Sequence, residues 1–237
     1  MPENVLITGA GRGLGLELAR LCSGRGDHVV ATARDTASVA ELAALPGVTL
    51  ATLDLSKSDS VSGAIAELAE RAGGMDLVIN NAAVNFRGVD HGNDTLSVET
   101  MSADPMLDLF RVNVVGPLLV VKGALRHLAE SGHGRVVNVS SWLASVSGFA
   151  PGAAANYGYR TTKAALVMAT RALAAEVGPM GVTAIAVNPG WMRTEMGGER
   201  AELDPADSAA GILDVAARLT PTDGGRFIDW DGTDHPY

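Results

Sequence analysis

Short apolar runs alternate along this chain with longer stretches whose apolar residues recur at helical spacing. The short runs predict strands, and the longer stretches predict amphipathic helices. The predicted strands cover residues 4–8, 28–33, 48–53, 77–80, 135–140, 182–188 and 227–230. The predicted helices cover residues 13–23, 56–71, 105–130, 159–177 and 205–219.

This repeated alternation of strand and helix predicts a parallel sheet of the α/β class. The runs at 136–139 and 184–187 are apolar on both faces, as in a sheet that helices cover on both sides. A chain of 237 residues is long enough for one well-buried core and too short for two full domains. We therefore expect a single-domain, doubly wound, seven-stranded parallel sheet.

Composition narrows the function classes. A net charge of −9 argues against a nucleic acid partner, because binding a polyanion needs clustered basic residues. The five His residues show no ligand spacing and the acids form no cluster, so we expect no metal. The single cysteine, Cys22, is expected to pack as a buried thiol. Neither a signal peptide nor a membrane span is visible, which makes the cytoplasm the expected location and a membrane partner unexpected.

A glycine-rich turn follows the first predicted strand. It covers residues 8–15 and places Gly9, Gly11, Gly13 and Gly15 where the first helix begins. Such glycines let the backbone approach a pyrophosphate, which then meets the free amides of the helix N-terminus. The alternative is a turn chosen only for close helix packing.

A tyrosine and a lysine stand four residues apart on a predicted helix. Tyr159 and Lys163 therefore share one face. A lysine charge at ~4 Å contributes roughly 4 kcal/mol toward ionising a phenol whose ordinary pKa is ~10, before burial opposes it. We expect Tyr159 to act as general acid and base. Ser141, after the fifth strand, is expected to hydrogen-bond the substrate oxygen, whereas Ser140 should face the other way.

Together these motifs resemble the short-chain dehydrogenase/reductase family. The resemblance rests on T-G-x-x-x-G-x-G at 8–15, Asn80-Asn81-Ala82, Asn113, Ser140-Ser141, Tyr159, Lys163 and Asn188-Pro189-Gly190. It implies a single Rossmann domain over residues 1–237 that transfers a hydride between nicotinamide and a carbonyl or alcohol carbon. It also implies catalytic roles for Asn113, Ser141, Tyr159 and Lys163, with Asn113 holding a water that relays protons to Lys163.

The same resemblance implies where the cofactor lies. Asp54, with Leu55 alongside, would receive the adenine amino group, although an ordinary helix cap at Asp54 is the alternative. Lys163 would also hold the nicotinamide ribose. The further residues implied for the cofactor are Gly9, Gly11, Arg12, Gly13, Leu14, Gly15, Arg34, Asn81, Ala82, Tyr159, Pro189, Gly190, Met192 and Thr194. Ala83 departs from the family pattern, which has Gly at this position.

The end of the second predicted strand bears on cofactor choice. An acid there would select NAD, but this chain has Ala33 followed by Arg34. Arg12 and Arg34 could together bind a 2′-phosphate. We therefore expect NADP(H) to be preferred. In the alternative, both arginines are solvated surface charges and NAD(H) binds equally well.

The long spacing from Ser141 to Tyr159, the run at 189–198 and the ending at 227–232 look like the C-factor and sniffer-type carbonyl reductase branch. We expect a loop at about 143–156 to cap the pocket and a loop at about 191–204 to close over the cofactor. The residues expected to line an apolar pocket are Trp142, Phe149, Tyr157, Trp191 and Met196. In the alternative, several of them fill the core.

Three functions follow from these features. The first is an NADP(H)-dependent carbonyl reductase acting on a ketone, aldehyde or secondary alcohol. The second is an NAD-linked alcohol dehydrogenase, and the third is a dinucleotide-binding signalling protein of the C-factor type with little turnover. The family resemblance further implies a homodimer or homotetramer that pairs through the helices predicted at 105–130 and 159–177.

Overall fold

Seven parallel strands form one sheet in the computed structural model, which describes residues 1–237 apart from the side chains of Ser38 and Ala40. The strand order is β3-β2-β1-β4-β5-β6-β7, so the predicted fold class is confirmed. Each strand starts where its sequence predicts or one residue later, and three end one residue early. The strands are β1 (Asn4–Thr8), β2 (His28–Ala33), β3 (Val48–Thr52), β4 (Leu77–Asn80), β5 (Arg135–Val139), β6 (Thr183–Asn188) and β7 (Phe227–Asp229).

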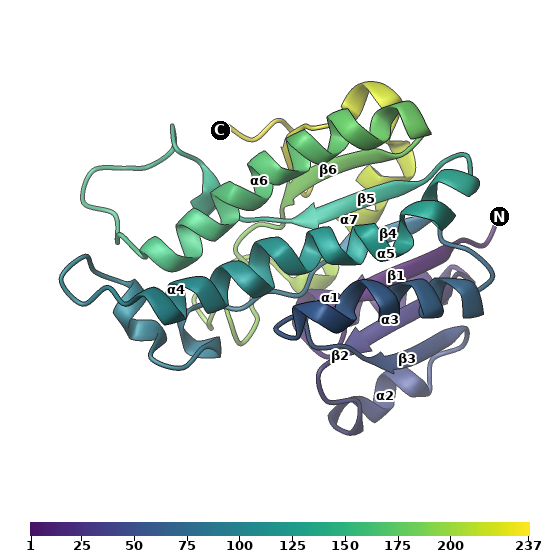
Figure 1. Ribbon diagram of the computed structural model, residues 1–237, viewed down its shortest axis with the longest axis horizontal. Helices are drawn as coiled ribbons and strands as arrows, with labels where there is room; N and C mark the ends of the chain where they lie inside the picture. The colour runs from purple at the N-terminus through teal and green to yellow at the C-terminus, as the bar shows by residue number, and fades with distance from the viewer.

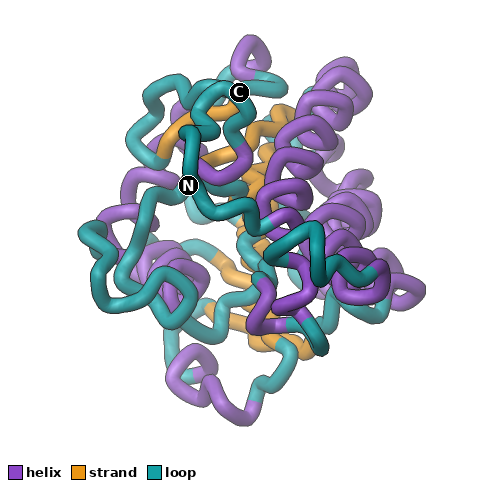
Figure 2. The backbone as a smooth tube through the Cα atoms, turned by 90° about the vertical axis from the view of Figure 1, so that its left-hand side faces the viewer, coloured by secondary structure: helices purple, strands orange, loops and turns teal.

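Helices cover both faces of this sheet, as Figure 2 shows. Alternate residues of each strand point to opposite faces, so Val5 and Ile7 pack with one group of helices and Leu6 with the other. One face carries α1 (Gly13–Gly24), α2 (Ala40–Ala43) and α7 (Pro205–Arg218). The other carries α3 (Ser58–Arg71), α5 (Gly116–Glu130) and α6 (Tyr157–Val177). Among the described residues, no helix combines the length and apolar character that a membrane crossing requires.

The helix predicted at 105–130 is interrupted. It divides into α4 (Ala103–Phe110), a π-helical turn over Arg111–Val115, and α5. Pro117 explains the interruption, because proline lacks an N–H and its ring clashes with the carbonyl four residues earlier. A π turn absorbs that clash without ending the helix. The prediction of one continuous regular helix was therefore wrong at this point.

The chain reverses its direction of travel across the sheet between β1 and β4. After β1 it builds outward through β2 and β3, and then returns to place β4 on the other side of β1. In such sheets the crevice beyond the carboxyl ends of the strands at the reversal is the ligand site. In Figure 1 these ends point to the left, where the loops that follow β4 and β5 project beyond the sheet.

Candidate active site

The glycine turn is folded so tightly that side chains would not fit. Gly9 and Gly13 have φ values of 66° and 54°, a region that disfavours other residues. A Cβ on Gly9 would lie 2.8 Å from the Cα of Ala82, and one on Gly15 would lie 2.3 Å from the Gly9 carbonyl oxygen. The turn therefore keeps its backbone close to the reversal point, where a ligand can reach its amides.

The residues after β4 fix this turn in place. The Thr8 hydroxyl accepts hydrogen bonds from the Asn81 and Ala82 amides, both at 3.1 Å. In return the Asn81 side-chain amide donates to the carbonyls of Thr8 at 2.9 Å and Gly9 at 3.0 Å. Hydrogen bonds thus join the segments that follow β1 and β4 at the carboxyl end of the sheet.

The turn and its surroundings fit a pyrophosphate and an adenosine. No described side chain caps the N-terminus of α1 and no acid occupies its first turn, so amides and the positive end of the helix dipole are directed at the crevice. Leu55 is buried three residues after the end of β3, next to Asp54. Burial works against the charge of Asp54, but two hydrogen bonds from Ser56, with help from nearby Lys57 and Arg34, hold the pKa of this carboxyl below its usual range.

Ser141 and Tyr159 meet at the carboxyl end of β5. Ser141 is buried, and its Oγ accepts from the Leu143 amide at 3.2 Å. Burial raises the pKa of Tyr159 to about 12, and its hydrogen bond with Ser141 acts in the opposite direction. Ser140 points elsewhere and donates to the Lys163 carbonyl at 3.1 Å. The serine that reaches the tyrosine is therefore the one expected from strand alternation.

Lys163 lies under Tyr159 and is almost fully enclosed. Its Nζ donates to the Val139 carbonyl at 2.8 Å and lies 5.6 Å from the centroid of the Tyr159 ring. Burial lowers the pKa of Lys163 to about 7. The expected shift of the Tyr159 pKa toward neutrality was therefore wrong for the protein by itself, because burial of the phenol outweighs the hydrogen bond with Ser141.

The depressed pKa of Lys163 predicts a pH-dependent stability. Between about pH 7 and 10.5 the unfolded lysine binds a proton that the folded one has lost, so stability rises with pH through this window. Relative to Lys163→Met, we expect the wild type to gain about 3 kcal/mol of unfolding free energy from pH 7 to 9.5. Urea unfolding of both proteins between pH 6 and 9.5 measures this, and a pH-independent difference would contradict it.

Asn113 lies in the π turn and is fully engaged. Its Oδ1 accepts from the Val84 amide at 2.9 Å, while its Nδ2 donates to the Val84 carbonyl at 2.8 Å and to the Thr162 hydroxyl at 3.1 Å. Thr162 in turn donates to the Tyr159 carbonyl at 2.8 Å. The π turn thus directs an asparagine that connects the segment after β4 to α6, the helix that carries Tyr159.

Thr162 was not predicted from the sequence, and Asn188 was named only within the Asn188-Pro189-Gly190 motif, with no role of its own. Thr162 connects Asn113 to α6, and Asn188 fixes the start of the loop after Ser141 by accepting from the Trp142 amide at 2.9 Å. Asn188 could have been found, because it ends β6 at the carboxyl edge as Ser141 follows β5. No local signal marks Thr162, since its partner is far away in the sequence.

The loop at 191–204 covers the tyrosine. The Tyr159 hydroxyl donates to the Met196 sulfur at 3.9 Å. Within the loop the Trp191 indole donates to the Gly197 carbonyl at 2.9 Å, and Met192 bridges to Leu203. Pro189 accepts a hydrogen bond at 2.7 Å from the buried hydroxyl of Ser208 in α7. The loop is therefore held by its own hydrogen bonds and by α7, and it lies against the Tyr159 hydroxyl.

The other expected pocket residues lie on the loop at 143–156 and beside it. The Arg160 guanidinium stacks on the rings of Phe149 at 4.6 Å and Trp142 at 5.9 Å, and its Nε donates to the Ala154 carbonyl at 3.0 Å. Tyr157 is partly exposed in the first turn of α6. Trp142 and Phe149 are thus gathered around Arg160, while Met196 alone of the expected pocket residues contacts the Tyr159 hydroxyl.

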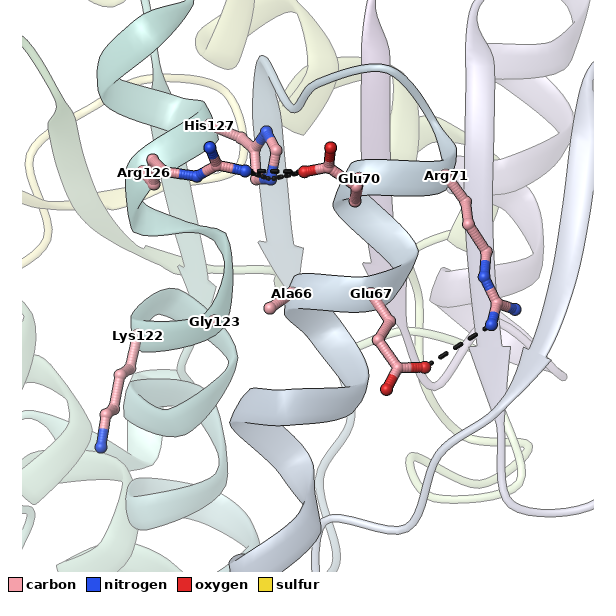
Figure 3. Close-up of a pocket in the computed structure, with 8 residues that line it drawn as sticks. All are labelled: Ala66, Glu67, Glu70, Arg71, Lys122, Gly123, Arg126 and His127. Carbon is pink, nitrogen blue, oxygen red and sulfur yellow. Dashed lines mark hydrogen bonds and ion pairs between the residues drawn. The ribbon is translucent and has the colours of Figure 1, made fainter.

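A separate hollow of about 510 Å³ lies between α3 and α5 (Figure 3). Its charged residues are largely paired: Glu70 accepts from Arg126 at 2.6 Å and lies 3.5 Å from His127, and Glu67 lies 3.5 Å from Arg71. Both helices run back across the sheet, so these C-terminal turns lie toward the amino ends of the strands. This hollow therefore lies at the amino end of the sheet, away from the candidate site at the carboxyl end.

Comparison with known proteins places these features in context. The family model described as short chain dehydrogenase matches residues 3–204. The chain is 36% identical over 165 residues to the C-signal of Myxococcus xanthus, covering 70% of this chain and 94% of that protein. It is 32% identical over 197 residues to a 3-oxoacyl-(acyl-carrier-protein) reductase, FabG, of Aquifex aeolicus, covering 81% of this chain and 74% of the relative.

Solved structures agree over the full chain. The carbonyl reductase Sniffer of D. melanogaster superposes with a TM-score of 0.89 at 26% identity, covering 100% of both chains. The NADPH-bound carbonyl reductase from chicken fatty liver also gives a TM-score of 0.89, at 28% identity, covering 100% of this chain and 99% of the other.

Proposed function

This chain belongs to the short-chain dehydrogenase/reductase family, in the branch that resembles C-signal and Sniffer, and on that premise we propose that it is an NADP(H)-dependent carbonyl reductase. In this proposal it transfers a hydride between nicotinamide and a ketone, an aldehyde or the corresponding secondary alcohol. The observation that carries the proposal is the meeting of Ser141, Tyr159 and Lys163 at the carboxyl end of the sheet, where the glycine turn also lies, next to a loop that contacts the tyrosine hydroxyl.

Tyr159 is the proton donor in the reductive direction. With a pKa near 12 the phenol is fully protonated at neutral pH, so it is ready to give its proton to a carbonyl oxygen. A bound nicotinamide dinucleotide supplies the hydride. Ser141 hydrogen-bonds the same oxygen as negative charge develops on it. Lys163, with a pKa near 7, holds a positive charge below the phenol in a fraction of molecules and favours release of the proton.

Asn113 is a positioning residue in this account. Its three hydrogen bonds to Val84 and Thr162 fix α6 relative to the segment after β4. Those bonds occupy both polar atoms of the amide. A water relay to Lys163, which the family resemblance implies, would therefore have to share the Asn113 side chain with Val84.

In this proposal the cofactor lies in the crevice beyond the carboxyl ends of the strands. The amides of Gly13, Leu14 and Gly15 would hold the pyrophosphate, and Asp54 with Leu55 would hold the adenine. Pro189, Gly190, Met192 and Thr194 would line the nicotinamide end. We place Arg12 and Arg34 at the 2′-phosphate, and two of the similar short-chain dehydrogenase structures, both from Burkholderia, are described as binding NADP.

An assay that follows the absorbance of the reduced nicotinamide tests the proposal. With a panel of aryl ketones, diketones, quinones and aldehydes, we expect at least one carbonyl to be reduced, with kcat/KM at least tenfold higher for NADPH than for NADH, because only NADPH carries the 2′-phosphate that the two arginines can bind. A preference for NADH would move the assignment to an NAD-linked alcohol dehydrogenase.

The similarity to C-signal favours a second candidate. In this alternative the protein binds the dinucleotide and acts in signalling with little turnover. Equilibrium binding separates the two, since tight NADPH binding with no turnover across the whole panel is the outcome that only the signalling function produces.

A further inference from the structure

One ion pair connects the glycine turn to the loop at 191–204. The guanidinium of Arg12, which immediately precedes α1, is bound by the carboxylate of Glu195. Arg12 follows β1 and Glu195 follows β6, so the pair joins two segments that both lie beyond the carboxyl ends of the strands. Both side chains are largely exposed, at 68% and 74%, so a ligand can reach either one.

The path of the backbone brings Arg12 and Glu195 together, so the ion pair does not depend only on the reach of two long side chains. A Cβ on Gly13 would lie 3.1 Å from the Thr194 methyl carbon, so the loop rests directly on the glycine turn. Beyond the contact, the Gly197 amide donates to the Thr194 hydroxyl at 3.1 Å and the Gly198 amide to the Thr194 carbonyl at 2.8 Å. Glu195 is therefore carried on a compact turn that keeps its carboxylate at Arg12.

We propose that Glu195 limits the preference for NADP(H) over NAD(H) by competing with the cofactor 2′-phosphate for Arg12. This inference rests on the proposed binding of NADP(H). A 2′-phosphate carries more negative charge than a carboxylate and accepts a bidentate arginine, so it displaces Glu195 when it binds. A cofactor without that phosphate leaves the ion pair intact. Glu195 thus weakens NADP(H) binding selectively and ties the 191–204 loop more firmly when NAD(H) is bound.

Binding of 2′,5′-ADP and 5′-AMP, measured by calorimetry, tests this without any turnover. In Glu195→Gln we expect the Kd of 2′,5′-ADP to fall by about two- to fivefold, the range that loss of a competing exposed ion pair allows, while the Kd of 5′-AMP stays unchanged. Glu199→Gln removes an exposed glutamate from the same loop and is the matched control, in which both constants should stay at wild-type values.

A double-mutant cycle separates competition from general charge repulsion. In Arg12→Gln, further substitution of Glu195 by Gln should have no effect on 2′,5′-ADP binding. An equal gain in the presence and absence of Arg12, or an equal gain for both nucleotides, overturns the inference. If the wild type binds neither nucleotide, the proposed cofactor function fails instead, so the two failures are distinct.

Discussion

We expect Tyr159→Phe to lower kcat for carbonyl reduction by a factor of about 10³, within the range that general acid catalysis usually contributes. The substitution removes the hydroxyl that meets both Ser141 and Met196 of the loop at 191–204, and leaves the ring that packs above Lys163. The Kd of NADPH should change less than threefold, since the glycine turn is untouched. Steady-state kinetics with equilibrium NADPH binding on the same samples measure both effects.

Tyr237→Phe is the matched control. It also removes a phenol hydroxyl, one that donates to the Gly225 carbonyl at 3.1 Å away from the catalytic group, and should keep wild-type turnover. Full activity in Tyr159→Phe would exclude Tyr159 as the proton donor. A loss of NADPH binding as large as the loss of kcat would show that the hydroxyl serves cofactor binding rather than proton transfer.

Gly15→Ala should raise the Kd of the dinucleotide at least a hundredfold and destabilise the fold. The added methyl would lie 2.3 Å from the Gly9 carbonyl oxygen and 2.9 Å from the Ala10 Cα, and both are backbone atoms that cannot swing away. Relieving the clash opens the turn that presents the amides of α1. The cost of such overpacking is about 1–3 kcal/mol of unfolding free energy. Calorimetric titration of NADPH and urea unfolding measure the two effects.

The same helix offers a control in Gly24→Ala. A Cβ at Gly24 meets nothing within 4 Å, so this substitution should leave NADPH affinity unchanged and stability equal or slightly higher. If Gly15→Ala binds NADPH as tightly as Gly24→Ala does, the turn does not serve as the phosphate cradle.

Periodicity alone was sufficient to predict the sheet, because fully buried parallel strands are apolar on both faces. Val136 and Val137, for example, pack against opposite helical layers. The pairing of Tyr159 with Lys163 was equally accessible, since a spacing of four residues fixes their common helix face whatever the rest of the chain does. Features that depend on local chain geometry can therefore be predicted from the sequence.

Features that depend on tertiary contact were not predictable in this way. The π turn at Arg111–Val115 arises from Pro117, but the sequence does not say that Asn113 will then reach Val84. The sign of the Tyr159 pKa shift depends on how completely the fold desolvates the phenol. The Arg12–Glu195 pair joins residues that only the loop conformation brings together.

The most direct test of hydride transfer follows the label itself. Wild-type protein is incubated with NADPH in which both hydrogens at C4 of the nicotinamide are deuterium and with the best carbonyl from the panel, and the alcohol is analysed by mass spectrometry and NMR. We expect one deuterium on the carbinol carbon, and loss of this product in Tyr159→Phe. NADPH that binds tightly while no labelled alcohol forms from any carbonyl would contradict this expectation.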